Sequence, residues 1–231
     1  MITNTTTAAM KWQEKLLKNC KCRDRRPRRP VKKETKMKII GVTGKSGAGK
    51  TTICKILKEK YNANIIDADE IARDLSKKGN KYLQAIANCF GEDILNASGE
   101  LQRKKLANII YESEEKRNDL NNITFIYVVE EMKEKISGLK NEKLVVIDAP
   151  LLFESGLDKM CDFVIGVTAS KAQKIERICK RDNITEEIAQ KRLEIQMEED
   201  EIRKRADYVI ENENDLQILE KEIEKIEDKL I

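Results

Sequence analysis

The stretch "MKIIGVTGKSGAGKTTICKIL", residues 37–57, decides the fold. A short apolar run typical of a buried strand leads into a glycine-rich loop, and a pattern typical of a helix follows. The loop fits the phosphate-loop pattern G-x-x-x-x-G-K-[ST]. Its glycines let consecutive backbone N–H groups approach phosphate oxygens, and the helix adds its positive N-terminal end. The alternative, a glycine turn with an incidental lysine, is disfavoured by the flanking strand and helix.

We therefore expect this loop to bind the triphosphate of a nucleotide. Lys50 is expected to reach the β and γ phosphates, and the hydroxyl of Thr51 to ligate Mg²⁺. The loop alone indicates a nucleotide and leaves the reaction open. The predicted nucleotide-binding residues in the loop are Gly44, Ser46, Gly47, Ala48, Gly49, Lys50, Thr51 and Thr52.

Further apolar runs alternate with helical patterns after the loop. Helices are expected over 50–61, 70–78, much of 81–140 and 171–205, with an amphipathic helix near the C-terminus. Apolar strands separated by helices predict an α/β fold with three layers, in which helices cover both faces of a parallel sheet. The predicted strands are 38–43, 63–69, 143–150, 162–170 and 206–212.

Composition narrows the class of protein. The chain has 231 residues, 37% of them charged, which suits one domain with an appended lid or arm. No apolar run approaches the roughly 20 residues that a membrane span needs, so we expect a cytoplasmic protein with no membrane contact. Six cysteines form no C-x-x-C pair and histidine is absent, which argues against a zinc site and favours reduced thiols.

Residues 1–36 differ from the rest of the chain. They carry 12 basic and 3 acidic side chains, a net charge of +9, whereas 33 basic and 38 acidic side chains follow, a net charge of −5. We predict a disordered basic extension over 1–36 and a domain that carries the phosphate loop over 37–231. The extension is either a basic arm for nucleic acid, anionic lipid or organelle targeting, or a non-functional addition, or the result of a start codon assigned too early, with Met37 beginning the domain. The mildly acidic domain is not expected to bind nucleic acid.

The remaining motifs favour a small-molecule kinase. The guanine motif N-K-x-D and the transporter signature L-S-G-G-Q are both missing from the sequence. Asp67 and Asp69 lie two residues apart, so that strand geometry would place both carboxylates on one side at the carboxyl edge of the sheet. Alternatively, Asp69 caps the helix from Glu70. Segment 171–205 offers Arg177, Arg181 and Arg192 as a clamp for phosphate charge, unless it is only a solvated helix.

The motifs together resemble the dephospho-CoA kinase family. "GVTGKSGAGKTT", "IIDADEIAR", "GELQRKKLANIIY", "LVVIDAPLLFESGL", "KRDNITEEIAQKR" and "ADYVIEN" occur in order between Met37 and Asn212. The resemblance implies a phosphate-loop kinase fold with a helical substrate insertion at about 81–140 and a lid at about 171–205. It implies transfer of the γ-phosphoryl group of ATP to the 3′-hydroxyl of the ribose of dephospho-CoA.

The resemblance also implies roles for individual residues. Asp69, Lys50 and Arg181 are the expected catalytic residues, with Arg192 a weaker lid candidate. Asp69, Arg73 and Arg103 are expected to bind the acceptor. Asn212 joins the nucleotide-binding residues. Asp148, at the end of a predicted strand, is a candidate magnesium ligand through water, beside Thr51.

One segment departs from the family pattern. The family usually shows L-N-x-[IL]-x-H-P in the insertion, whereas this chain has "LNNITFIYVV", with Phe125 and Ile126 in place of His-Pro. Either Phe125 fills the space of a structural histidine, or acceptor binding is altered. Two other functions stay open: another small-metabolite or nucleoside monophosphate kinase, and a nucleotide-dependent switch. The protein is expected to be a monomer or a weak homo-oligomer.

Overall fold

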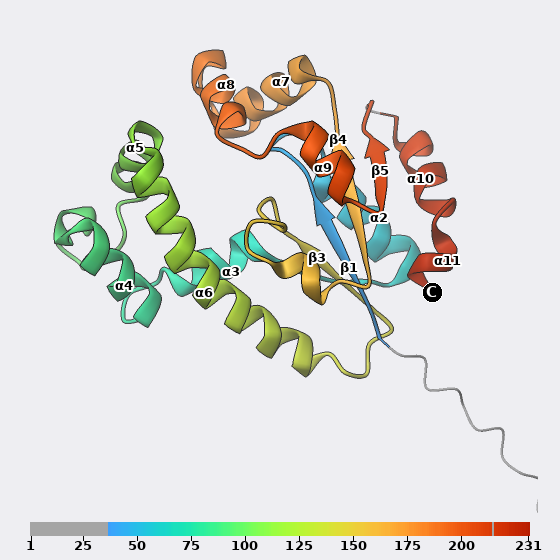
Figure 1. Ribbon diagram of the computed structural model, residues 1–231, viewed down its shortest axis with the longest axis horizontal. Helices are drawn as coiled ribbons and strands as arrows, with labels where there is room; N and C mark the ends of the chain where they lie inside the picture. Colours follow the sequence, from blue (N-terminus) through green and yellow to red (C-terminus); the bar gives the residue numbers. More distant parts are fainter. Residues whose placement is uncertain (1–36, 214) are drawn as a thin grey trace, which may run out of the picture. The chain divides into compact units, whose positions relative to one another are not determined.

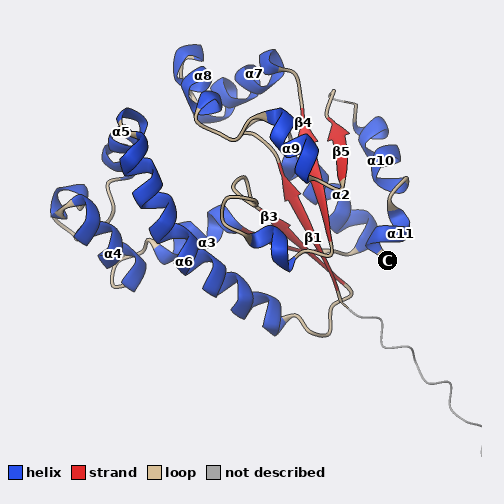
Figure 2. Ribbon diagram, in the orientation of Figure 1, coloured by secondary structure: helices blue, strands red, loops and turns tan. Residues whose placement is uncertain are grey.

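The computed structural model describes residues 37–213 and 215–231, so the predicted basic extension lies outside the described residues. Five strands form one parallel sheet in the order β2-β3-β1-β4-β5, coloured red in Figure 2. This sheet confirms the predicted α/β fold. The strands are β1 (Lys38–Thr43), β2 (Asn64–Asp67), β3 (Leu144–Asp148), β4 (Phe163–Thr168) and β5 (Tyr208–Glu211).

Alternating side chains divide the sheet into two apolar faces. In β1, Ile40 and Val42 face one cluster, whereas Ile39 packs against the other, as the two-residue period of a strand requires. The first cluster is covered by α2 (Lys50–Tyr61), α10 (Leu216–Glu224) and α11 (Glu227–Leu230). The second is covered by α3 (Ala68–Leu75), part of α6 (Glu114–Gly138), the 3₁₀ helix η2 (Leu157–Met160) and α9 (Glu199–Arg205). The three predicted layers are visible in Figure 1.

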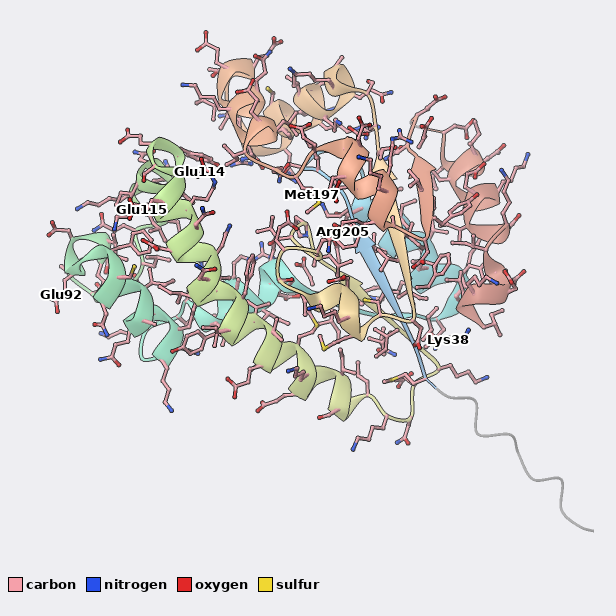
Figure 3. The ribbon with its side chains drawn as sticks, viewed as in Figure 1. Lys38, Glu92, Glu114, Glu115, Met197 and Arg205 are labelled. Atoms are coloured by element: carbon pink, nitrogen blue, oxygen red, sulfur yellow. The ribbon has the colours of Figure 1, made fainter. Side chains whose placement is uncertain are left out.

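The segment predicted as an insertion consists of α4 (Lys81–Phe90), the 3₁₀ helix η1 (Glu92–Ile94), α5 (Arg103–Glu112) and α6. It has a core of its own, built around Tyr82, Ile86, Ile94 and Leu106. Helix α6 also reaches the main core, where Val128 and Met132 are buried. Figure 3 labels Glu92 near the outer end of this segment and Glu114 at the start of α6.

The segment predicted as a lid begins with α7 (Lys171–Asp182) and α8 (Glu186–Glu194), which lie beyond the carboxyl end of β4 (Figure 1). Their small core contains the buried side chains of Ile178, Ala189 and Leu193. Helix α9 belongs instead to the main core, because Ile202 is buried against the sheet. The part that stands apart is therefore the α7–α8 pair.

No helix among the described residues is both long and apolar enough to cross a bilayer.

Candidate active site

The phosphate loop joins β1 to α2 in a conformation that requires glycine. Gly47 and Gly49 have positive φ angles of 76° and 102°. A Cβ at Gly47 would lie 2.6 Å from the carbonyl oxygen of Lys174, and one at Gly49 would lie 1.8 Å from Nδ2 of Asn212. The glycines thus leave room for α7 and for Asn212, in addition to a ligand.

Two side chains from distant segments hold the carbonyl groups of this loop. Arg177 of α7 donates to the carbonyl of Gly47 at 2.9 Å, and Asn212 donates through Nδ2 to the carbonyl of Ala48 at 2.8 Å. Arg177 also donates to the carbonyl of Asn212 at 3.3 Å. In this structure the guanidinium of Arg177 supports the loop, and its expected contact with phosphate stays a prediction. Asn212, predicted to contact nucleotide, is buried beside the loop.

Lys50 begins α2 and donates to the carbonyl of Gly44 at 3.0 Å. Burial lowers the pKa of its ammonium group, while the charges of Asp148 and Asp69 oppose that effect. Thr51, the next residue, is exposed in the first turn of the same helix. The predicted phosphate-binding lysine therefore lies close to two carboxylates, as a phosphoryl-transfer site needs.

Asp148 ends β3, and its register partner in β2 is Asp67. Burial raises the pKa of Asp148 to about 6, with Lys50 opposing the rise and Asp67 adding to it. Oδ1 of Asp148 is buried and has no hydrogen-bond partner among the described residues. A buried oxygen of this kind suits a hydrated cation.

Within the described residues no three His, Cys, Asp or Glu side chains are grouped to hold a metal ion. A magnesium ion here would take most of its ligands from phosphate and water, which is the usual arrangement for this ion. The hydroxyl of Thr51 and the unpartnered oxygen of Asp148 fit such a site.

The structure corrects the reading of the two aspartates after the second strand. β2 ends at Asp67 and α3 begins at Ala68, so strand geometry does not relate Asp67 to Asp69. The cap of α3 is Asp67, whose Oδ1 accepts from the backbone N–H groups of Asp69 at 2.7 Å and Glu70 at 3.1 Å. The alternative role of Asp69 as the cap is therefore also wrong.

Asp67 caps the helix, and Asp69 lines two pockets beside α3. Burial raises the pKa of Asp69, and the charge of Asp67 raises it further. Lys50, Arg73 and Arg181 act in the opposite direction. Asp69 is thus a stronger base than the ordinary aspartate that the sequence alone suggested.

A pocket between α3 and the insertion brings three predicted residues together. Asp69, Arg73 and Arg103 line it, beside apolar residues of α4, α5 and α6. Arg103 donates to Oγ of Ser76 at 2.6 Å, which orients its guanidinium from α5 toward α3. An adjoining apolar pocket is lined by Asp69 and Phe125, so an aromatic ring fills the position of the histidine that the family pattern leads one to expect.

The other two arginines of the segment predicted as a lid share one carboxylate. Asp182 accepts two hydrogen bonds from Arg181, at 2.7 and 2.9 Å, and one from Arg192. These arginines lower the pKa of Asp182 to about 2, with the Arg181 hydrogen bond the main cause. Arg192 also donates to the hydroxyl of Tyr111 at 3.2 Å, so α8 contacts α5.

Sequence reasoning missed the capping role of Asp67 and the contact made by Tyr111. The first had a signal, because an aspartate followed three residues later by glutamate is a pattern of helix N-termini. The second had none, because Tyr111 and Arg192 are 81 residues apart.

Comparison with known proteins identifies the family. The sequence profile of the dephospho-CoA kinase family matches residues 38–217. The chain belongs to the dephospho-CoA kinase family. A dephospho-CoA kinase from Fusobacterium nucleatum is 41% identical over 190 residues, which cover 81% of this chain and 95% of that protein. One from Arabidopsis thaliana is 37% identical over 195 residues, covering 82% of each. The resemblance drawn from the motifs is confirmed.

Solved structures agree with this family. A crystal structure from Thermus thermophilus has a TM-score of 0.71 and 28% identity, covering 85% of this chain and 99% of that one. A Campylobacter jejuni dephospho-CoA kinase has a TM-score of 0.58 and 28% identity, covering 83% and 96%. Shikimate kinase from Acinetobacter baumannii, 19% identical with a TM-score of 0.52, shares the fold. The protein is a kinase of this family.

Proposed function

We propose that the cleft transfers the γ-phosphoryl group of ATP to the 3′-hydroxyl of the ribose of dephospho-CoA, giving coenzyme A and ADP. The observation that carries the proposal is that Lys50 at the start of α2, Asp69 at the start of α3 and Asp148 at the end of β3 all follow the carboxyl ends of neighbouring parallel strands. Membership of the dephospho-CoA kinase family supports the choice of acceptor.

The phosphate loop holds the nucleotide in this proposal. Its backbone N–H groups and the N-terminus of α2 bind phosphate oxygens, and Lys50 neutralises the charge of the β and γ phosphates. Magnesium, when bound, supplies further charge neutralisation for the transferred group. Thr51 would hold it directly and Asp148 through water. The carboxylates around Lys50 keep its ammonium group charged against the effect of burial.

Asp69 acts on the acceptor. Its carboxylate accepts the hydrogen bond of the 3′-hydroxyl, orients the oxygen in line with the γ-phosphorus and takes the proton as the new bond forms. The raised pKa of Asp69 makes it a better proton acceptor near neutral pH. Arg73 and Arg103 line the same pocket and supply positive charge for the diphosphate of dephospho-CoA. Arg181 stabilises the charge on the transferred group.

An ADP-release assay with several acceptors tests the reaction. We expect turnover with dephospho-CoA to exceed by far that with adenosine, AMP or CMP. Turnover preferring AMP or CMP would instead indicate a nucleoside monophosphate kinase. Slow ADP release that no acceptor accelerates would indicate a nucleotide-dependent switch.

Asp69→Asn tests the proposed base. The substitution keeps the shape of the side chain and removes the proton acceptor, so kcat should fall about 10²- to 10⁴-fold with little change in ATP affinity. Glu70→Gln, at the exposed neighbouring position of α3, is the matched control and should keep the wild-type rate. A defect confined to ATP binding in Asp69→Asn would contradict the role of this carboxylate.

A further inference from the structure

The tip of the phosphate loop makes a paired contact with a residue that follows the lid. Gln196 accepts through Oε1 from the backbone N–H of Ser46 at 2.9 Å, and donates through Nε2 to Oγ of Ser46 at 3.0 Å. The two bonds use both ends of one carboxamide, so they fix its orientation. Ser46 and Gln196 are 150 residues apart.

The neighbouring loop residue contacts the same segment. The ammonium group of Lys45 donates to the carbonyl of Leu193 at 3.3 Å and lies 3.6 Å from a carboxylate oxygen of Glu198. Segment 193–198 therefore holds two consecutive residues of the phosphate loop. On one side of it, Arg192 lies in the last turn of α8. On the other, Met197, labelled in Figure 3, packs against the main core.

This arrangement links the loop to the charges of the lid. Arg192 lies four residues before Gln196, and it shares the carboxylate of Asp182 with Arg181. A movement of segment 193–198 relative to the loop would therefore displace the guanidinium of Arg192 and disturb the carboxylate that it shares with Arg181. Displacements of about 1 Å can reduce phosphoryl transfer by about 100-fold.

We infer that Gln196 is a positioning residue for phosphoryl transfer: its carboxamide joins the lid to Ser46 and so places Arg181 and Arg192 over the transferred phosphate. The inference rests on the proposed function. A glutamate at this position would accept from the N–H and the hydroxyl of Ser46, but it would bring a negative charge to the triphosphate. An alanine would make neither bond. The two substitutions therefore separate the contact from the charge.

The test compares Gln196→Ala and Gln196→Glu with Gln190→Ala. Gln190 lies on α8, and its side chain forms no hydrogen bond within the described part of the chain. For Gln196→Ala we expect kcat to fall about 10- to 100-fold, with the KM for dephospho-CoA within about threefold of wild type. For Gln196→Glu we expect kcat to fall less and the KM for ATP to rise. Gln190→Ala should match wild type.

Hydrogen exchange supplies a second measurement. With magnesium and a non-hydrolysable ATP analogue bound, amides of α8 should lose protection in Gln196→Ala and keep it in Gln196→Glu, whereas amides of α2 stay protected in both. Adding Ser46→Ala to Gln196→Ala should reduce kcat less than the product of the two single effects, because the partner is already lost.

The outcomes distinguish the two proposals. Wild-type kcat and wild-type exchange in Gln196→Ala would overturn the role of Gln196 and leave the reaction standing. A loss of protection throughout the chain would also overturn it, since the residue would then support folding alone. A wild-type protein without dephospho-CoA-dependent turnover would instead overturn the proposed function.

Discussion

The segments predicted as the insertion and the lid contact one another through Tyr111 and Arg192, but they are attached to the rest of the protein by different forces. The insertion shares α6 with the main core, because Tyr127 packs in its own cluster while Val128 and Met132 pack in the main one. The lid has a core of only three buried apolar residues within α7 and α8. Its hydrogen bonds to the phosphate loop involve Arg177 and the carbonyl of Leu193, and Gln196, just after α8, adds two more.

The difference has a functional consequence. Apolar packing is lost only when surfaces separate, whereas a hydrogen bond can be exchanged for one to water or phosphate at little net cost. We therefore expect the insertion to keep its place on the sheet and the lid to open and close during turnover. In our proposal, the insertion binds the acceptor, and the arginines of the lid stabilise the charge of the transferred phosphate.

The largest expected effect comes from the lysine between the two regions. Lys50→Ala removes the ammonium group beside Asp69 and Asp148, and kcat should fall about 10³-fold or more. Lys55→Ala, at an exposed position of the same helix, is the control for α2. Steady-state kinetics with dephospho-CoA measures both. Turnover by Lys50→Ala near the wild-type rate would contradict the proposed role of Lys50 in phosphoryl transfer.

Core substitutions test the difference in attachment directly. Met132→Ala creates a cavity where α6 meets the main core and should lower the free energy of unfolding by about 2–5 kcal/mol. Ile178→Ala, in the small core of the lid, should lower it by about 1 kcal/mol or less, because the lid opens locally before the sheet unfolds. Urea unfolding measures both, with Ile126→Ala, 67% exposed, as the control. Equal losses would remove the distinction between the regions.

Substitutions of two arginines test whether the insertion binds the acceptor and the lid stabilises the transferred phosphate. Arg181→Ala should lower kcat about 100-fold with a small change in the KM for dephospho-CoA, because Arg181 acts on the transferred phosphate. Arg103→Ala should raise that KM about tenfold with a smaller change in kcat, because Arg103 lines the acceptor pocket. If both variants change kcat and the KM for dephospho-CoA to the same extent, the separate roles assigned to the insertion and the lid are contradicted.

Asp148 and Asp182 should give opposite pH dependence. Burial raises the pKa of Asp148 to about 6, so the folded state binds its proton more tightly than the unfolded state does. The stability contributed by protonated Asp148 is full below about pH 4 and is lost as the pH rises through 6. Asp148→Asn, measured by urea unfolding without nucleotide, should gain on the order of 2 kcal/mol over wild type between pH 4 and pH 8.

The stability contributed by Asp182, the carboxylate shared by Arg181 and Arg192, changes with pH in the opposite direction. Its arginines lower the pKa of Asp182 to about 2, so its contribution is present above about pH 4 and is lost as the pH falls through 2. Asp200→Asn, at an exposed position, is the control for Asp148→Asn, because it also removes one negative charge. If Asp148→Asn has the same pH profile as wild type, the burial assigned to this carboxylate is wrong.

The smallest effect is expected at the departure from the family pattern. Phe125 lines the apolar pocket beside Asp69. Phe125→His restores the residue that the family usually has, but the proposed reaction does not need an imidazole at this position. We expect kcat and the KM for dephospho-CoA to stay within about threefold of wild type. A large decrease in the KM for dephospho-CoA would show that Phe125 has altered acceptor binding by the insertion of this chain.

Local patterns in the sequence determined the phosphate loop, the alternation of strands and helices and the kinase family. Glycine spacing, strand periodicity and the order of the motifs each act over a few residues, so they can be read without the fold. The same patterns predicted that Lys50 and Asp148 lie at the carboxyl edge of one parallel sheet, because β1 and β3 are both apolar runs that end there.

Only the tertiary structure decided which side chains serve which partners. Arg177 turned out to support the carbonyl of Gly47, 130 residues away, and Gln196 to contact Ser46. The cap at Asp67 had a local signal in the sequence, but the structure decided between Asp67 and Asp69, because β2 ends at Asp67 and α3 begins at Ala68. Hydrogen bonds between distant segments depend on distances of a few tenths of an ångström, which sequence spacing does not contain.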